Sequence, residues 1–492
     1  MTSKKTKGAK MNLNQILQDK YPQLELSVLR LSEVKKDNES FRIDSEHFKK
    51  SNLALNSSLE FVSLSQIALI NPSNQEISNL NTNLEITFLS MQNLGNGMIN
   101  NREQGLIKDF KNGYTYFAQD DILIAKITPC MEHGKCTIAS NLKNNIGFGS
   151  TEFNVFRIID SRFLKEYVFC YLNRENIRKI AADNMVGTSG RQRVPTSFYE
   201  NLKIPLLPMS FQQELEKLVL DSHNFLEQSK LLYKEAQELL YTSLGLDPHK
   251  PLESLMHRHA SLPCDDKAQP LNISIRTLKE SLLKTGRLDS EYYQLKYDLI
   301  EEHIKNYTNG YIILNSTNIK DKNFTPLKEQ KYRYIELANI GANGVISEPL
   351  EDFGINLPSR ARRLVESGDL IVSSIEGSLS SCALITNDFH HCLVSTGFYV
   401  LKTKDINSET LLVLFKSEFF QEYLKKFPSG TLLSAISKDE LQKICIPLID
   451  KNIQEQIQSK ITQSFSLRSK SKELLQEAKQ RVEKAIEHSS KE

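Results

Sequence analysis

The stretch Asp120-Asp-Ile-Leu-Ile-Ala-Lys-Ile127 occurs a second time as Gly368-Asp-Leu-Ile-Val-Ser-Ser-Ile375, half a chain length further on. Five further segments return in the same order, one of which is Ser150-Thr-Glu-Phe153, repeated as Ser395-Thr-Gly-Phe398. The offset between the copies drifts only between 242 and 248 residues. One such match is noise, but six in one order indicate an internal duplication.

Composition limits the classes of protein to which the chain can belong. Its 492 residues carry 62 Lys and Arg against 60 Asp and Glu, so the net charge is +2. That balance is too even for binding polyanions by bulk charge, and any nucleic-acid site must be a local patch. The apolar runs are too short to span a bilayer, and no apolar segment follows the basic residues 1–10. We therefore expect a globular, cytoplasmic protein with a solvated N-terminal tail.

The cysteines give no sign of a disulfide framework or a metal site. Seven Cys, an odd number, are scattered along the chain, as expected of reduced cytosolic thiols. The compact segment Cys130-Met-Glu-His133-Gly-Lys-Cys136 lacks an evident fourth ligand for zinc. We interpret its residues as members of an ordinary turn and expect no bound metal.

Each copy begins with a mixed α/β domain and ends with one long helix. Short runs of β-branched and aromatic residues between Asn-Gly and Gly-Asp turns predict strands at 85–91, 121–127, 152–158, 333–337, 370–375 and 397–401. A helix is predicted after the last strand of each copy, at 163–180 and at 408–425.

The long helices are indicated by a heptad spacing. In the first copy the seam is Leu215, Leu218, Ser222, Phe225, Ser229, Leu232, Ala236 and Leu239. Shifted by 242, it becomes Ile457, Lys460, Ser464, Leu467, Ser471, Leu474, Ala478 and Arg481. Since neither helix can bury its stripe alone, we predict that the two pair antiparallel around a pseudo-twofold axis, with small Ser and Ala allowing a close approach.

The predicted fold class is α/β (α+β), with two similar domains separated by a coiled coil of two long helices. The expected divisions are a tail and short helix (1–49), a first domain (50–208), the first long helix (209–245), a linker with the start of the second repeat (246–294), a second domain (295–448) and the second long helix (449–492). Gly245 is expected to stop the first helix, and a polar linker to run on to about Pro270.

Sequence motifs for catalysis are missing. Neither Gly147-Phe-Gly149 nor Asn71-Pro-Ser-Asn74 provides the cofactor loop and catalytic segment of a methyltransferase. Gly134-Lys135 lacks the remainder of a phosphate-binding loop, and no HExxH or Gly-x-Ser-x-Gly segment occurs. A non-catalytic chain is therefore favoured, although acid–base pairs can be distant in sequence.

The repeat, the long helices and three segments resemble the specificity subunit of type I restriction–modification enzymes. The segments are residues 121–135, 147–153 and 187–194, and an Ile-Pro-Leu-x-Pro stretch leading into Gln212-Gln213 is equally typical. The resemblance extends from about residue 24 to 490. The second copy departs from the pattern, with Ser373-Ser-Ile-Glu-Gly377 where the first has Ala125-Lys-Ile-Thr-Pro129.

The resemblance implies recognition of double-stranded DNA rather than catalysis. Each domain would be a target-recognition domain reading one half of a split site. The implied partners are two adenine-N6 methyltransferase subunits that use S-adenosylmethionine and ATP-driven restriction subunits, with ATP and Mg bound there; this chain would bind no cofactor and no membrane. Two alternatives stay open: a related system with a fused methyltransferase–nuclease partner, and an anti-restriction or scaffolding mimic, which the net charge of +2 disfavours.

The long helix has the dimensions of a spacer ruler. Residues 210–241 would extend about 48 Å at ~1.5 Å per residue, which matches about 14 base pairs. Inserting four residues into the first helix is therefore expected to change the spacer that the protein accepts.

Within each domain, bases are expected to be read by hydrogen bonds, while phosphate contacts set the register. The first choice is Gly190-Arg191-Gln192-Arg193, since Arg can pair with guanine and Gln with adenine. The expected phosphate contacts of this domain are Lys126, Lys108, Lys111, Asn112 and Tyr114. The candidates in the second domain are Arg360, Arg362 and Arg363 for phosphates, and Ser373, Ser374, Glu376 and Ser378 for bases.

Residues shared by the copies are candidates for protein contacts, because two identical partners need similar surfaces. The two helix starts supply Phe211, Gln212, Gln213, Ile453, Gln454 and Gln456. Helix-start chemistry explains this repetition equally well. Turn geometry is favoured for Asn96-Gly97 and Asn343-Gly344, and capping for the Arg-x-Asp-Ser-Glu segments at 42 and 287.

Overall fold

The structure is a computed structural model that describes residues 13–24, 26, 28–35, 43, 59–188, 190–259, 274–315, 319–320, 322–341, 343–430 and 434–489. The chain divides into two compact units. Unit 1 comprises Met1–Phe225 with Ser469–Glu492, and unit 2 comprises Leu226–Arg468. The N-terminal tail 1–10, most of the linker 260–273 and the Arg42 motif lie outside the described residues, apart from Ile43.

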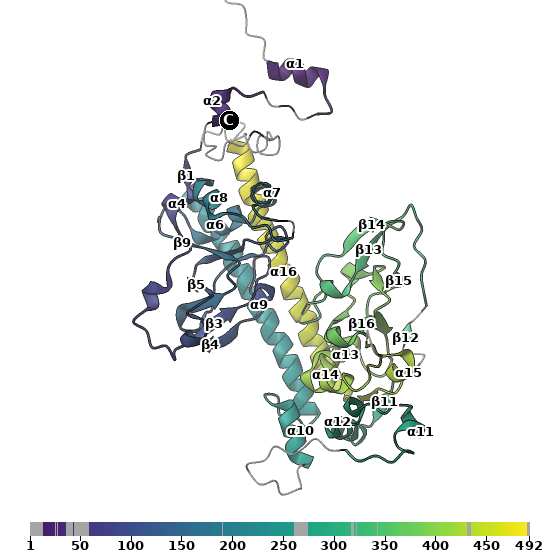
Figure 1. The fold of residues 1–492 in the computed structure, drawn as a ribbon. Helices are drawn as coiled ribbons and strands as arrows, with labels where there is room; N and C mark the ends of the chain where they lie inside the picture. The colour runs from purple at the N-terminus through teal and green to yellow at the C-terminus, as the bar shows by residue number, and fades with distance from the viewer. Residues whose placement is uncertain are drawn as a thin grey trace, which may run out of the picture. The chain divides into compact units, whose positions relative to one another are not determined.

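Unit 1 is built on two four-stranded sheets and a two-stranded ribbon (Figure 1). The first sheet has the order β2 (Ala68–Ile70), β9 (Phe153–Ile158), β6 (Ile122–Ala125), β7 (Cys136–Ile138), and the second β4 (Glu103–Leu106), β3 (Glu85–Leu89), β8 (Ile146–Gly149), β5 (Thr115–Ala118). The ribbon pairs β1 (Phe61–Ser63) with β10 (Lys203–Pro205). The short helices described in unit 1 include α1 (Leu13–Lys20), α2 (Leu31–Lys35), α4 (Leu64–Ile67), α5 (Ile107–Phe110) and α8 (Thr196–Asn201).

Unit 2 repeats every one of these pairings. Its sheets have the orders β12 (Ile319–Lys320), β19 (Phe398–Leu401), β16 (Leu370–Ser373), β17 (Cys382–Leu384) and β14 (Leu350–Phe353), β13 (Lys331–Ile335), β18 (Leu393–Ser395), β15 (Ala361–Leu364). The ribbon pairs β11 (Tyr311–Ile313) with β20 (Cys445–Pro447). Among the strands described, the parallel pairing also recurs, as β3 with β8 and β13 with β18. The predicted duplication and the six predicted strands are confirmed.

The turn before the central strand has the same geometry in both copies of the 120–127 segment. Asp120 and Gly368 both adopt positive φ, at 74° and 85°, a conformation that Asp and Gly tolerate best. The next residue in each copy, Asp121 or Asp369, is buried and accepts a backbone hydrogen bond from the start of its own turn, at 2.7 and 2.9 Å. The wholly buried strands β6 and β16 follow.

The predicted helix after the last strand is wrong in one respect, since each copy has two helices there. Unit 1 has α6 (Lys165–Leu172) and α7 (Glu175–Asp183), and unit 2 has α13 (Ser408–Lys416) and α14 (Glu418–Leu424). The helix is interrupted at Arg174 and at Ser417, where the backbone is extended with nearly identical φ and ψ angles. Ser417 also caps α14 by accepting a hydrogen bond from the Phe420 amide.

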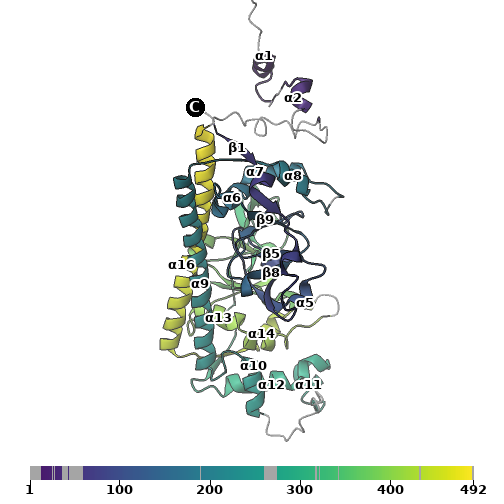
Figure 2. The ribbon, with the colours of Figure 1, turned by 90° about the vertical axis from the view of Figure 1, so that its left-hand side faces the viewer.

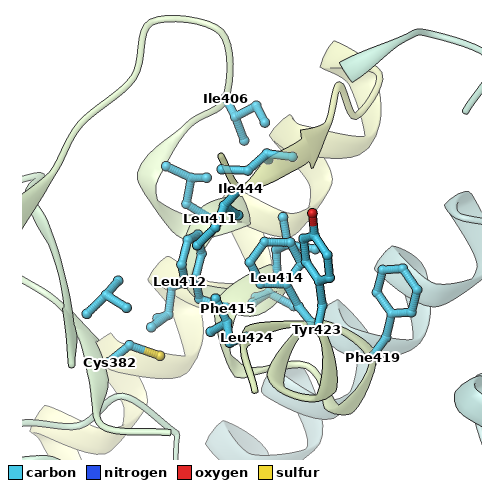
Figure 3. Close-up of a cluster of buried hydrophobic side chains, with 14 of the residues drawn as sticks. Cys382, Ile406, Leu411, Leu412, Leu414, Phe415, Phe419, Tyr423, Leu424 and Ile444 are labelled. Atoms are coloured by element: carbon cyan, nitrogen blue, oxygen red, sulfur yellow. The ribbon is translucent and has the colours of Figure 1, made fainter. Parts of the chain in front are cut away.

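The two helices of unit 2 fill its core. Leu411, Leu412, Leu414 and Phe415 from α13 lie in one buried cluster with Phe419, Tyr423 and Leu424 from α14 (Figure 3). Cys382, Ile406 and Ile444 are labelled in the same cluster. Burial of so many large apolar side chains is the main stabilising contribution to this unit.

The long helices are α9 (Met209–Ser243) and α16 (Lys451–Ser489), which lie side by side (Figures 1 and 2). In unit 1, Ser222 contacts Ser471 with their hydroxyl oxygens 3.0 Å apart, and Glu214 pairs with Arg481. In unit 2, Ser229 and Ser464 are also 3.0 Å apart, and Glu235 pairs with Lys460. Residue numbers rise along one helix as they fall along its partner, so the pairing is antiparallel in each unit, as predicted.

The buried seam differs from the predicted one in every second position. The buried residues of α9 are Gln212, Leu215, Val219, Ser222, Leu226, Ser229, Tyr233, Ala236, Leu240 and Tyr241. The predicted Leu218, Phe225, Leu232 and Leu239 are only half-buried and flank this seam. The apolar stripe is wider than two positions per heptad because each helix packs against a domain as well as against its partner helix.

A further helix, α10 (Pro251–His259), lies in the predicted polar linker. Proline is compatible with the first turn of a helix, and Leu255 is fully buried. Unit 2 also contains α11 (Leu282–Thr285), α12 (Leu295–Lys305) and α15 (Lys438–Leu441). Gly245 ends α9 with a φ of 70°, as expected of a glycine stop. Among the helices described, none combines the length and the apolar character needed to cross a membrane.

Candidate nucleic-acid interface

Three loops meet at one end of the central strands of unit 1. They are residues 126–135 after β6, residues 150–152 before β9, and residues 186–194, of which Ser189 lies outside the description. The Lys126 amide donates to the Glu152 carbonyl at 2.9 Å, and the Lys126 carbonyl accepts from the Val194 amide at 2.9 Å. We call this arrangement the unit 1 platform. It brings together Lys126 and the Gly190-Arg191-Gln192-Arg193 segment, which are far apart in sequence.

The third loop is closed at its neck and joined to the first. Val186 and Arg193 exchange two backbone hydrogen bonds of 2.9 Å, and the Thr128 amide donates to the Gln192 carbonyl at 3.1 Å. The loop tip is thus presented on a fixed base. Arg191 is exposed and Gln192 half-buried, so both stand at the surface of the platform.

Arg193 is held in an ion pair rather than left open. Its guanidinium donates to both carboxylate oxygens of Glu152, the shortest contact being 2.6 Å. This hydrogen bonding holds the pKa of Glu152 below its usual value. Since Glu152 already neutralises Arg193, Arg191 and Gln192 are the stronger candidates for base contacts.

The basic-aromatic stretch of unit 1 is only partly brought to the platform. Tyr114 precedes Thr115, which pairs with Gly149 beside the second loop, and its ring packs edge-on against Phe88 with the centroids 5.1 Å apart. Lys111 and Asn112 lie in the turn leading to Tyr114. By contrast, the Lys108 amide bonds to the Thr82 carbonyl on the approach to β3, and the structure does not bring this residue to the platform.

Unit 2 has a platform with the same backbone connections. Its loops are residues 374–381, 396–397 and 429–436, of which 431–433, including Thr431, lie outside the description. The Ser374 amide donates to the Gly397 carbonyl at 2.9 Å, and its carbonyl accepts from the Ile436 amide at 2.8 Å. Ser429 and Ala435 close the neck of the third loop, and the Glu376 amide donates to the Ser434 carbonyl at 3.1 Å. Each bond has its counterpart in unit 1.

The side chains at matching positions differ between the platforms. Lys126 corresponds to Ser374, Thr128 to Glu376, and Gln192 to Ser434. The ion pair of Arg193 with Glu152 is replaced by Ala435 and Gly397. Comparison of the repeats residue by residue would have added Thr128, Glu152, Thr396 and Ser434 to the predicted set, which missed them.

The candidate serines of unit 2 make hydrogen bonds within their own unit. Ser373 is fully buried and its hydroxyl lies 2.9 Å from that of Ser378, so the prediction that Ser373 contacts bases is wrong. The Ser374 hydroxyl donates to the Gly397 carbonyl at 3.0 Å. Glu376 is exposed, and its contact with a base stays a prediction.

The three arginines of unit 2 differ in how far they are engaged. Arg360 is more than half exposed and pairs with Glu336 at 2.7 Å, and its carbonyl accepts from the Thr396 amide of the second loop. Arg362 is half-buried and donates to the Ser359 carbonyl. Arg363 donates to the Phe398 carbonyl and lies over the Tyr399 ring. Arg360 and Arg362 are therefore better placed for phosphates than Arg363.

Two of the predicted partner-binding residues have an internal role. Gln212 is fully buried; its amide donates to the carbonyls of Arg162 and Leu207 and accepts from the Leu164 amide. Gln454 makes the corresponding bonds in unit 2, to Asp405, Ile449 and Asn407. Both tie a long helix to its domain, so the prediction that they contact a partner is wrong.

The other predicted partner-binding residues stand at the surface to different degrees. Gln213 and Gln456 are exposed, while Phe211 and Ile453 are half-buried against the core of their own unit.

The segments considered for cofactor binding do not form a binding loop. Gly147 and Gly149 lie in the buried strand β8, and a side chain at these positions would collide with the rings of Phe117 and Phe153. Within the described residues, no group of three or more His, Cys, Asp or Glu side chains is arranged to hold a metal ion. Cys136 is buried in β7.

Comparison with known proteins gives curated relatives from Escherichia coli. The chain is 34% identical over 236 residues to the specificity subunit of the type I restriction enzyme EcoAI, covering 46% of this chain and 39% of that one. It is 32% identical over 243 residues to the EcoEI specificity subunit, covering 47% and 40%. The chain thus matches about two fifths of the length of these relatives. No family model matches it.

The solved structures that match the chain are more distant in sequence. The HsdS subunit from Thermoanaerobacter tengcongensis is 16% identical, with a TM-score of 0.30 and coverage of 87% of this chain and 96% of that chain. The type I restriction–modification S subunit from M. genitalium is 15% identical, with a TM-score of 0.37 and coverage of 88% and 97%. Over nearly half of its length, the chain is similar to the specificity subunits of type I restriction enzymes.

Proposed function

We propose that this chain is the DNA-specificity subunit of a type I restriction–modification complex, in which each α/β domain reads one half of a bipartite target. The observation that carries the proposal is the pair of platforms, whose backbone bonds are the same and whose side chains differ. Two readers of different short sequences need one docking geometry and two sets of base-contacting groups. The similarity to curated specificity subunits supports the same conclusion.

The proposed contacts follow from the chemistry of the exposed groups. In unit 1, Arg191 would pair with guanine and Gln192 with adenine, while Lys126 and Tyr114 contact the backbone. In unit 2, Glu376 would accept from the amino group of cytosine, with Arg360 on a phosphate. The secondary candidates are Lys111, Asn112, Arg193, Arg362, Ser374 and Ser378.

The proposal assigns the chemical steps to partners. Two methyltransferase subunits would bind S-adenosylmethionine and methylate adenine N6, and restriction subunits would use ATP and Mg. The corresponding starts of α9 and α16 offer Phe211, Gln213, Ile453 and Gln456 as candidate contacts with the methyltransferases. Acting on cellular DNA, the complex would reside in the cytoplasm.

Mapping methylated adenines tests the proposal. The full chain is expressed with its methyltransferase partner in cells lacking other adenine methylation, and their DNA is sequenced for N6-methyladenine. We expect a split motif with a constant spacer, lost when this chain is omitted. A continuous motif would contradict two readers, and the absence of any motif would favour a mimic that does not read DNA.

We also infer that the long helices set the spacer. Seven residues inserted between Ser222 and Ser229 of α9, and seven between Ser464 and Ser471 of α16, keep the heptad register of the pair. Each helix lengthens by about 10 Å, which corresponds to about 3 base pairs. The same mapping should then return the same two half-sites with a longer spacer; an unchanged spacer would contradict the inference.

A further inference from the structure

Arg287 of unit 2 lies against the chain segment that leads into the third platform loop. Its guanidinium donates to three consecutive backbone carbonyls, those of Lys426, Phe427 and Pro428, at 3.4, 3.3 and 2.9 Å. The next residue, Ser429, begins the closed neck of that loop. One side chain, 139 to 141 residues away in sequence, therefore binds three consecutive carbonyls at the base of the loop.

Arg287 is itself held from the other side. It forms a two-point ion pair with Asp289, at 2.8 and 2.6 Å, and lies over the Tyr292 ring at 4.5 Å. Only 14% of its side chain is exposed. The planar guanidinium can serve the carboxylate and the carbonyls together, which the single ammonium of lysine cannot do.

The loop held in this way contributes directly to the platform. Ser434 accepts from the Glu376 amide, and Ile436 donates to the Ser374 carbonyl. The base of the loop is set by Arg287, and its neck is set by the pairing of Ser429 with Ala435. A shift of the base would move the third loop relative to Glu376.

We propose that Arg287 is a positioning residue for DNA recognition by unit 2, acting by fixing the base of the 429–436 loop without touching DNA. The inference rests on the proposed function, because it takes the platform as the reading surface. It also gives the Arg-Leu-Asp-Ser-Glu segment a role beyond capping, since this segment connects the start of the repeat to the platform.

The first measurement does not depend on DNA. Hydrogen exchange of the full chain is compared between the wild type and Arg287→Gln, with Arg276→Gln as the matched control. Arg276 lies in the same segment, pairs with Asp298 and lies over the Tyr293 ring, and neither residue belongs to the loop. In Arg287→Gln, amides in 426–430 and 434–436 should exchange about tenfold faster or more, while those of β16 stay protected. Arg287→Lys should raise the exchange rate as much as Arg287→Gln does. Asp289→Asn should give an exchange rate between those of the Arg287 variants and that of the wild type.

The second measurement is sequence discrimination by the complex with its methyltransferase partner. Arg287→Gln should lose about tenfold in discrimination against single-base changes in one half-site, with the other half-site and the spacer unchanged. Arg276→Gln should retain both. An equal loss at both half-sites, or unaltered exchange of the loop in Arg287→Gln, would overturn the proposal.

Failure of the two proposals can be told apart. If the wild-type complex shows no preference for a split target, the proposed function fails, and the recognition role of Arg287 fails with it, whatever the exchange data show. If the wild type discriminates and Arg287→Gln discriminates equally well despite a loosened loop, only the positioning role is wrong. A melting temperature close to that of the wild type shows that Arg287→Gln has folded; if it does not fold, Arg287→Lys carries both measurements.

Discussion

Lys126 of unit 1 and Ser374 of unit 2 make the same two backbone hydrogen bonds, yet one carries a cation and the other a hydroxyl group. The same holds at the other matching positions of the platforms, where Thr128 of unit 1 corresponds to Glu376 of unit 2. Backbone bonds are indifferent to side chains, so a loop frame can stay constant while its exposed groups vary. Under the proposed function, docking geometry and sequence reading would therefore be carried by separate sets of atoms.

The residues behind the platform behave differently from those on it. Gln212 and Gln454 are identical and make matching bonds at matching positions. Asp121 and Asp369 are also identical, but one pairs with Arg157 and the other with Lys320. Burial therefore preserves the residues that hold the frame, although their partners have diverged.

The largest effect is expected from the glutamines. Gln212→Leu removes three hydrogen bonds and leaves their backbone partners unpaired in the core, which should lower the free energy of unfolding by about 4 kcal/mol. Gln454→Leu should cost the same within about 1 kcal/mol. Chemical denaturation, followed by hydrogen exchange in α6 and α13, measures both. If either substitution lowered the free energy of unfolding by less than an ordinary surface substitution does, the two glutamines would not be equivalent.

A smaller and unequal effect is expected from the aspartates. Asp121→Asn deprives the half-buried Arg157 of a two-point ion pair and should cost about 3 kcal/mol. Asp369→Asn should cost only about 2 kcal/mol, because Asp369 makes a single contact with Lys320, whose side chain is more exposed than that of Arg157. Urea denaturation of the two variants measures the difference. Equal costs would mean that the divergence of the partners has no energetic consequence.

The frame of each unit could largely be predicted from its apolar runs. Strands such as β6 and β16 are short apolar segments after a Gly-Asp or Asp-Asp turn, a local signal. The breaks at Arg174 and Ser417 were missed because the apolar pattern continues through them without Gly or Pro. Helix α10 is not predicted, because the sequence pattern assigns Pro251 to a polar linker. This proline occupies the first turn of the helix.

The site could be predicted less well, because its members meet through tertiary contacts. Arg191 and Lys126 were chosen for their chemistry, but nothing local shows that loops 126–135 and 186–194 are neighbours. Ser373 and Gln212 were misassigned since polar residues in polar segments suggest exposure, and only the packed structure shows them buried. Aligning the two copies was the signal that could have identified the matching loop positions.

Substitutions on the platforms should separate the two readers. Arg191→Ala should weaken binding by about 1–3 kcal/mol for targets with the correct base in one half-site and relax specificity there alone. Glu376→Ala should do the same for the other half-site. Competition binding with single-base variants of the target measures both. Lys108→Ala, distant from the platform, is the control and should leave specificity unchanged; relaxation of both half-sites by either variant would contradict separate readers.

The smallest effect concerns a turn that the two units support differently. The Asn96 side chain accepts from Lys479 of α16 and from Asn173, both at 2.8 Å. The matching position to Lys479 in α9, at the offset of 242, is Gln237, and the turn of unit 2 packs Gly344 against Leu412 instead. In unit 1 the ammonium at this turn thus comes from the long helix α16, near Cys136 and Cys170, whereas in unit 2 it comes from Lys416 of α13, which donates to the Gly341 carbonyl at 2.9 Å.

Burial lowers the pKa of Lys479 from 10.5 to about 8. Between these two values the unfolded chain binds more protons than the folded one, so the contribution of Lys479 to the free energy of unfolding rises with pH from about 8 to 10.5 and is constant below that range. Lys479→Met should remove this rise and change stability at pH 7 by no more than about 1 kcal/mol. Gln237→Met should leave the slope as it is in the wild type. Denaturation midpoints from pH 7 to 10.5 measure this, and a slope that survives unchanged in Lys479→Met would mean that other titrating groups, and not the Lys479 amine, cause it.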